Sequence, residues 1–280
     1  MRFKLYREHG ALNSPEIFNA FEQGLISLGH EIVKNDEDVA VIWSVLWQGR
    51  MAGNQQVYKK CKETNTPIII IEVGNLLRGK TWRLSINNIN GLGEFGNLED
   101  LDAGRPKKLG IDLQPVQQQR RGEILIAAQH SHSLQWEGMK PMKVWVEETI
   151  DRVRQYSKRR IVVRPHPRSL FPLKIPGIII DQPKRVPNTY DDFNIFYNYH
   201  CVINHNSGPA VQAAIQGVPV ICDASSLASK LSGTIENIEK ITLPDREDWF
   251  LKLSHTEWTV EEISNGLPQS RLINKILQNR

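Results

Sequence analysis

Side chains that bind anions follow three apolar runs in the second half of this sequence, and each run is predicted to be a strand: residues 124–128, 161–163 and 202–203. The candidate ligands are Gln129, His130, Ser131, Arg164, His166, Arg168, Asn206, Ser207 and Gly208. Because parallel strands end at one edge of their sheet, we expect these groups to converge. Arg, His and Ser donors beside a helix start are typical of phosphate or diphosphate binding. The structural alternatives are a Pro-His-Pro turn and a simple serine helix cap.

The first half of the chain carries groups that could serve an acceptor. Removing a proton from a hydroxyl needs a positioned carboxylate or imidazole, and the candidates are Glu8 and His9, in the loop after the first predicted strand, and Glu72, at the end of another. Aromatic and basic residues that could stack on bases or hold phosphates are Trp47, Arg50, Arg78, Lys80, Trp82 and Arg83. The tryptophans could equally belong to the core, and both glutamates could be structural hydrogen-bond partners.

Several short patterns resemble cofactor motifs without their expected context. Gly74 to Thr81 matches GxxxxGK[ST] after a strong strand, but the residues that follow indicate a strand rather than the helix that a phosphate loop needs. Gly91 to Gly96 matches GxGxxG, again with no helix after it. Two DxD patterns, residues 36–38 and 100–102, lie in predicted turns. We therefore expect loops and turns at all of these positions.

Metal binding is not expected from the histidines. His130 and His132 are two residues apart, and His200 and His205 are five apart, but neither pair comes with an HExxH pattern or clustered carboxylates. The three cysteines are widely separated and form no CxxC, which favours a reducing cytoplasm over a disulfide or zinc framework.

Strands and helices alternate in both halves of the sequence, which predicts parallel α/β sheets. The clearest strand is residues 67–73, which is rich in β-branched residues. Residues 105–122 interrupt the alternation with Pro, Gln and positive charge, and we interpret them as a linker. The predicted domains are an acceptor-binding domain (1–118), a nucleotide-sugar-binding domain (119–262) and a C-terminal helix (263–280) that could pack back on the first. We expect two Rossmann-like domains facing a central cleft.

Length and charge fit this organisation. At roughly 150 residues per domain, 280 residues suggest two domains. The net charge of +4 permits an anionic partner without requiring one. The sequence shows no apolar run long enough to span a membrane and no apolar leader, so we expect a cytoplasmic protein.

Two α/β halves with an RPHP segment and a later NSGP helix start resemble glycosyltransferases of the GT-B class. Within that class, the chain is similar to phage enzymes that glycosylate hydroxymethylated DNA bases, the hydroxymethylcytosine DNA arabinosyltransferase type included. The similar stretches are residues 4–14, 41–52, 70–82, 129–139, 164–169 and 256–268. RPHP also occurs in capsule and lipopolysaccharide sugar transferases.

This resemblance implies an enzyme that moves arabinose, or another pentose or hexose, from a nucleotide-sugar such as a UDP-sugar to a hydroxymethylated pyrimidine in phage DNA. His166, Arg164 and Ser207 would hold the donor phosphates, and Glu8, His9 or Glu72 would be the base, with no metal or other cofactor. Trp47 or Trp82 would stack where a flipped base enters, in the host cytoplasm. The alternatives are a capsule or lipopolysaccharide transferase using a CMP- or UDP-sugar, a P-loop NTPase, and a non-catalytic DNA-binding protein.

Overall fold

The computed structural model describes residues 1–97, 100–116, 122–182 and 196–279. Contacts divide the chain into two compact units. The first unit contains Met1–Arg105, His132–Leu134 and Leu251–Arg280, and the second contains Pro106–Ser131 and Gln135–Phe250. The chain first leaves the first unit after Arg105, whereas the predicted boundary is at 118. Apart from His132–Leu134, it returns to the first unit at Leu251, earlier than the boundary at 262 predicts.

The segment expected to be a linker begins with a short helix, α3 (Arg105–Leu109). This differs from the prediction of an irregular linker, because Pro106 occupies an early helical position, where proline is tolerated. Residues 117–121 of the same segment lie outside the described part of the chain.

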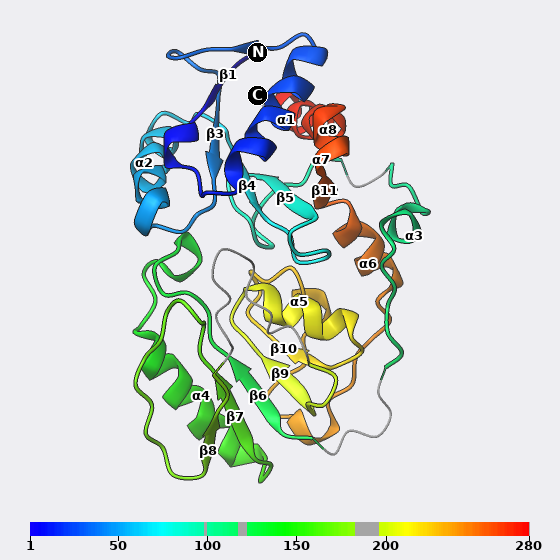
Figure 1. Cartoon of the computed structure of the whole chain (residues 1–280). Coiled ribbons are helices and arrows are strands. Elements are labelled where there is room, and N and C mark those ends of the chain that lie inside the picture. The colour runs from blue at the N-terminus through cyan, green and yellow to red at the C-terminus, as the bar shows by residue number, and fades with distance from the viewer. Residues whose placement is uncertain (98–99, 117–121, 183–195, 280) are drawn as a thin grey trace. The chain divides into compact units, whose positions relative to one another are not determined.

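The first unit is built on a six-stranded mixed sheet in the order β11-β5-β4-β3-β1-β2 (Figure 1). Its strands are β1 (Arg2–Leu5), β2 (Glu31–Ile32), β3 (Val39–Trp43), β4 (Ile68–Val73), β5 (Thr81–Ile86) and β11 (Glu257–Thr259). β1 to β4 pair in parallel, whereas β5 is antiparallel to both β4 and β11. The edge next to β5 is thus completed by a strand from the end of the chain.

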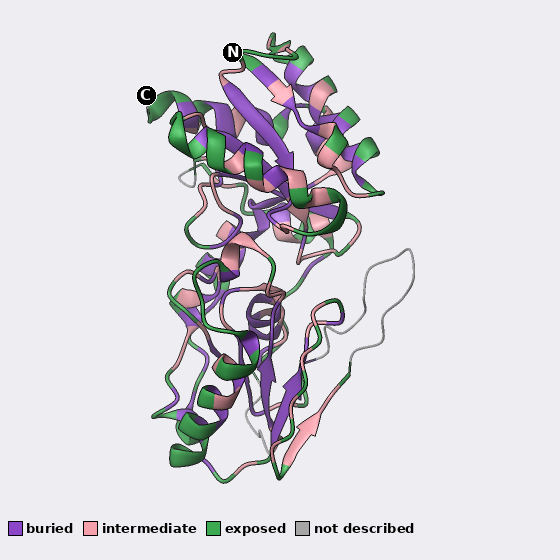
Figure 2. Cartoon of the chain, turned by 90° about the vertical axis from the view of Figure 1, so that its left-hand side faces the viewer, coloured by how far each residue is buried: buried purple, intermediate pink, exposed green. Residues whose placement is uncertain are grey.

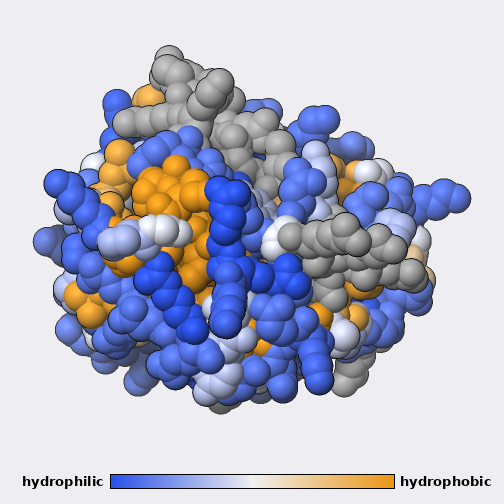
Figure 3. Space-filling model, turned by 90° about the horizontal axis from the view of Figure 1, so that it is seen from below, coloured by the Kyte–Doolittle hydropathy of each residue, from blue (hydrophilic) through white to orange (hydrophobic). Residues whose placement is uncertain are grey.

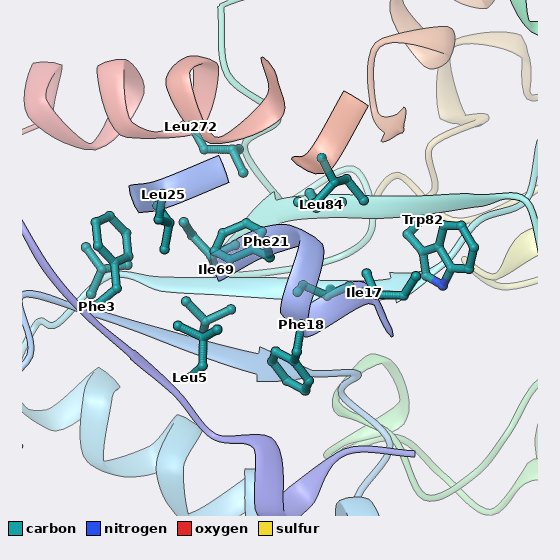
Figure 4. Close-up of a cluster of buried hydrophobic side chains, with 14 of the residues drawn as sticks. Phe3, Leu5, Ile17, Phe18, Phe21, Leu25, Ile69, Trp82, Leu84 and Leu272 are labelled. Carbon is teal, nitrogen blue, oxygen red and sulfur yellow. The ribbon is translucent and has the colours of Figure 1, made fainter. Parts of the chain in front are cut away.

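Helices cover both faces of this sheet, as a buried parallel strand such as β3 requires. The helices of the unit are α1 (Ser14–Ser27), α2 (Asn54–Glu63), α7 (Val260–Ser264) and α8 (Leu267–Gln278). Alternate strand residues pack toward α1, α7 and α8 in one cluster, and the others pack toward α2. Figure 4 shows Phe18, Phe21 and Leu25 of α1 with Ile69 and Leu84 of the sheet.

The C-terminal helix α8 is part of the first unit's core. Leu272, Ile273 and Ile276 of α8 belong to the cluster that also contains the buried residues of α1. The side chain of Gln269 donates hydrogen bonds from Nε2 to the carbonyl oxygens of Phe21, at 3.1 Å, and Ile263, at 2.7 Å. Both ends of the sequence thus build one unit.

The second unit has a five-stranded, fully parallel sheet in the order β10-β9-β6-β7-β8. Its strands are β6 (Ile124–Ala127), β7 (Ile161–Arg164), β8 (Ile178–Ile180), β9 (Cys201–Ile203) and β10 (Val220–Ile221). The helices are α4 (Met142–Tyr156), α5 (Gly208–Ile215) and α6 (Glu247–Ser254), and α6 continues from this unit into the first. Figure 2 shows β6, β7 and β9 as buried strands and β8 as intermediate.

None of the helices in the described residues is both long and apolar enough to cross a bilayer. The face drawn in Figure 3 is mostly hydrophilic, with one larger hydrophobic patch and several smaller ones scattered over it.

Candidate functional site

The first strand of the second unit, β6, lies between β7 and β9. After β6 the chain adds β7 and β8 on one side of it and then β9 and β10 on the other, so the strand order switches sides at β6. In open parallel sheets, ligands bind at the carboxyl ends of the strands at such a switch point. Eight of the nine residues predicted to bind the donor lie in the segments that follow β6, β7 and β9, and the ninth, Arg164, is the last residue of β7. The topology therefore brings the predicted residues to one edge of one sheet.

The segments after β6 and β7 touch through two pairs of side chains. The rings of His130 and His166 meet edge to face, with centroids 5.1 Å apart. The hydroxyl oxygens of Ser131 and Ser169 are 2.9 Å apart. The Arg168 amide donates to Nδ1 of His166 at 3.1 Å, which in the neutral ring leaves the proton on Nε2. His166 is half-buried and has the tautomer that donates a hydrogen bond from Nε2.

The segments after β6 and β9 are joined by a reciprocal amide pair. Gln129 donates from Nε2 to Oδ1 of Asn206 at 3.0 Å, and the Asn206 amide donates to Oε1 of Gln129 at 3.1 Å. Both residues are buried, and Nδ2 of Asn206 also donates to Oγ of Ser225 at 2.9 Å. These two side chains were predicted to bind a ligand directly, but their contacts indicate that they hold two segments together.

Ser207 and Gly208 stand at the start of α5. Ser207 is the N-cap residue, its backbone is extended, and its side chain makes no capping bond to the helix. Its amide instead donates to Oδ1 of Asn204 at 2.9 Å. The amides of the first helical turn lack partners within a helix, and their dipoles favour a negative charge. This eight-residue helix can therefore contribute to an anion site together with His166 and Ser131.

Arg164 corrects one prediction. Its side chain is 8% exposed, and Nε donates to Oδ2 of Asp181 at 2.7 Å. The guanidinium also donates to the hydroxyl of Tyr199 and lies over the ring of Phe196. These partners belong to the same unit, so Arg164 stabilises the sheet edge rather than presenting charge to a ligand. Arg168, by contrast, is exposed.

His205 lies beside the predicted donor residues, although the sequence suggests it only as a possible metal ligand. Its ring packs edge to face on Trp136 and Trp145, with centroid distances of 5.2 and 6.5 Å. Burial lowers the pKa of His205, and the Asp223 carboxylate offsets part of that effect. Burial thus favours the neutral form of this imidazole, which lies next to Asn206 in the segment after β9. In the sequence, the only indication that His205 lies near the predicted donor site is its position directly before Asn206.

In the first unit, two of the predicted bases, Glu8 and His9, follow the end of β1, and the third, Glu72, is the penultimate residue of β4. Glu8 and His9 lie in a short 3-10 helix, where Glu8 is exposed and the ring of His9 packs against Gly53. Asn54 links this segment to the end of β3, because its Nδ2 donates to the carbonyl oxygens of His9 and Trp43. Glu72 is partly exposed, and its Oε2 accepts a hydrogen bond from the Ser44 hydroxyl at 2.6 Å.

The GxxxxGK[ST] segment surrounds a carboxylate of the chain itself. The amides of Asn75 and Leu76 donate to Glu257 at 2.6 and 2.9 Å, and the Thr81 hydroxyl donates to it at 3.0 Å. Arg83 completes the set with an ion pair at 3.0 Å. Glu257 has no exposed surface, and the strand β5 begins at Thr81 in place of a helix. The prediction of a loop rather than a nucleotide-binding motif agrees with this geometry.

These contacts also correct part of the predicted acceptor surface. Arg83 is 5% exposed and Trp82 is 6% exposed within the core cluster of the first unit. Trp47 is partly buried, and its ring packs against Tyr58 at 5.7 Å. The tryptophans therefore contribute to packing. The remaining predicted contacts that are exposed are the side chains of Arg50, Arg78 and Lys80.

The other motifs have structural explanations. A side chain at Gly93 would meet the carbonyl oxygen of Asn88, so this glycine permits a tight turn. Asp38 pairs with Arg2, and Asp100 pairs with Arg271. Among the described residues, no group of three or more His, Cys, Asp or Glu side chains gathers as a metal site.

No known protein family and no curated protein matches this sequence. Among solved structures, the KpsC beta Kdo 2,4 transferase of Thermosulfurimonas dismutans aligns with a TM-score of 0.52 and 11% identity, covering 96% of this chain and 98% of that chain. The KpsC beta Kdo 2,7 transferase of the same organism gives 0.49 and 11%, covering 96% and 99%. At such identity the likeness concerns the fold alone. The predicted fold, an α/β chain with two Rossmann-like domains in the GT-B architecture, is confirmed.

Proposed function

We propose that this chain is a glycosyltransferase that moves a sugar from a nucleotide-sugar donor to a hydroxyl group. The observation that carries the proposal is the set of contacts at the carboxyl edge of the second unit's sheet, where His130 meets His166 and Ser131 meets Ser169. The likeness of the fold to a sugar transferase supports it.

In this proposal the second unit holds the donor phosphates. Half-buried donors beside a helix start stabilise the negative charge that develops on the departing nucleotide, and such stabilisation commonly contributes more to the rate than any other effect. His166 donates from Nε2, and the first amides of α5 add their dipoles. Gln129 and Asn206 keep the surrounding segments in place. The scheme requires no metal, because protein groups act on the leaving group.

The proposed acceptor is a hydroxymethylated pyrimidine of phage DNA, with arabinose or another pentose or hexose transferred from a UDP-sugar in the host cytoplasm. The resemblance of the sequence to phage DNA-modifying enzymes supports this acceptor. Exposed Arg50, Arg78 and Lys80 of the first unit could contact DNA phosphates. A base in duplex DNA would have to leave the stack to react.

A second candidate is a transferase of the capsule or lipopolysaccharide type that uses a CMP- or UDP-sugar. The observation that favours it is the fold match to a beta Kdo 2,4 transferase over 96% of this chain. The burial of Trp82 and Arg83 also removes two of the groups proposed to hold DNA.

Mass spectrometry of hydroxymethylcytosine DNA, incubated with the protein and a panel of UDP- and CMP-sugars, tests the proposal. A mass gain equal to one sugar, lost in His166→Ala, supports the DNA acceptor. Donor consumption with saccharide acceptors but not with DNA supports the second candidate. If the protein consumes no donor with either acceptor, the proposed activity is wrong.

A further inference from the structure

Ser44 has an unusual backbone conformation at the end of β3. Among the described residues, four residues other than glycine have positive φ, and the other three are Asp36, Asn65 and Asn87. Asp and Asn tolerate this left-handed region because their short polar side chains bond locally, whereas serine rarely adopts it. Ser44 has φ of 63° and is buried. Non-glycine residues in sparsely populated conformations cluster at functional sites.

The conformation brings the Ser44 hydroxyl to the carboxylate of Glu72, the penultimate residue of the neighbouring strand β4. Oγ donates to Oε2 of Glu72 at 2.6 Å and accepts a hydrogen bond from the Leu46 amide at 3.2 Å. The Ser44 amide donates to the carbonyl oxygen of Ile71 at 2.8 Å, which fixes the turn against β4. The Val73 amide donates to Oε1 of Glu72 at 2.9 Å. Each carboxylate oxygen thus has one fixed donor.

The other predicted bases lack this combination of support and access. Glu8 is exposed on a short 3-10 helix, and His9 packs its ring directly on Gly53. Glu72 is partly exposed, yet both of its oxygens are oriented by groups on rigid strand ends. A base held in this way is preorganised for proton transfer, because little reorientation is needed when the substrate binds.

We infer that Glu72 is the general base of the proposed glycosyl transfer and that Ser44 is its positioning residue. This inference rests on the proposed function. The Glu72 carboxylate takes the proton of the acceptor hydroxyl, and the hydroxyl oxygen forms a bond to the anomeric carbon of the donor sugar. The bond between that carbon and the nucleotide oxygen breaks, and its electron pair leaves with the phosphate. The proton on Glu72 is then released to water.

Four variants test the inference, with nucleotide release measured on the donor and acceptor identified by the mass-spectrometry panel. Ser44→Gly removes the hydroxyl but accepts the left-handed backbone, so the protein should remain folded. We expect kcat to fall about 10- to 100-fold in Ser44→Gly, with an unchanged KM for the donor and an undiminished thermal midpoint. Glu72→Gln should lower kcat about 10³-fold.

The double variant and a matched control separate positioning from structure. Ser44→Gly in the Glu72→Gln background should cost no further activity, because residues that act as a unit are not additive. Asn65→Gly makes a similar change at another left-handed residue, which is exposed and lies before β4, and should leave kcat unchanged.

If the wild-type protein transfers sugar and either Glu72→Gln or Ser44→Gly keeps its full kcat, the inference is overturned. The proposed function then remains intact. A Ser44→Gly variant that loses kcat only in proportion to lost folded protein would also overturn it. Wild-type protein with no turnover on any donor would refute both.

Discussion

Two regions of this molecule match the chemistry of anion binding, and they differ in what occupies their donors. In the loop after β4, the amides of Asn75 and Leu76, together with Thr81 and Arg83, all meet the buried carboxylate of Glu257. In the second unit, the contacts join the segments after β6, β7 and β9 to one another, and the His166 side chain is half-buried rather than fully enclosed. Motif spacing alone does not separate these cases, because a carboxylate and a phosphate attract the same donors.

The largest expected effect is on the stability of the loop after β4, whose donors are occupied by Glu257. Glu257→Ala leaves Arg83 buried without its carboxylate and removes the acceptor of three further donors. Removing one partner of a buried ion pair costs about 3–5 kcal/mol. Denaturant unfolding of the protein measures this loss. Glu261→Ala, at an exposed position in the following helix, is the matched control and should cost less than about 0.5 kcal/mol. Similar unfolding free energies for the two variants would show that the buried carboxylate of Glu257 does not stabilise the loop after β4.

The comparison also predicts which region binds nucleotide. His166→Ala removes a donor of the second unit, and a hydrogen bond to a charged group is worth about 1.5–3 kcal/mol, or roughly 10- to 100-fold in affinity. Calorimetric titration with UDP and CMP should show this loss. Lys80→Ala should leave nucleotide affinity unchanged, because Glu257 already occupies its loop. A loss of affinity in Lys80→Ala alone would reverse the roles of the two regions.

Within the RPHPR segment, two arginines should behave differently. Arg164→Ala breaks the partly buried pair with Asp181, so we expect a loss of about 2 kcal/mol in the unfolding free energy of the second unit. Arg168→Ala changes an exposed side chain and should shift stability by less than about 0.5 kcal/mol. Urea unfolding of both variants distinguishes them, and equal destabilisation would contradict the structural role of Arg164.

The smallest effect concerns pH. Burial lowers the pKa of His205 in the folded protein, so below its ordinary pKa of about 6.5 the unfolded chain binds a proton that the folded chain does not. Stability should therefore fall as the pH drops from 7 to 5, by at most about 1.4 kcal/mol per pH unit for this residue. Unfolding measured at pH 7, 6 and 5 should show a shallower fall in His205→Gln. If the unfolding free energy of His205→Gln falls with pH as steeply as that of the wild-type protein, His205 does not cause the loss of stability at low pH.

The sequence predicted the local elements well, because β-branched runs such as Ile68–Val73 and the alternation of strands and helices carry their own signal. The convergence of the segments after β6, β7 and β9 followed from the parallel topology. Partners distant in sequence were not predicted. Glu257 lies 182 residues from Asn75, and no local pattern indicates that it fills the loop. Likewise, nothing near Arg164 indicated that Asp181 would bind it, or that Ser44 would turn back to Glu72.

The return of the chain to the first unit at Leu251 has a consequence for synthesis. A ribosome makes the N-terminal residues first, so β5 emerges long before its neighbour β11 exists. During that interval the donors of the loop after β4 and the guanidinium of Arg83 have no Glu257 to meet. The second unit, whose residues are all made earlier than β11, has the opportunity to fold before the first is complete. Residues 251–280, which are made after all of the second unit, then supply β11, α7 and α8, the elements that complete the first unit.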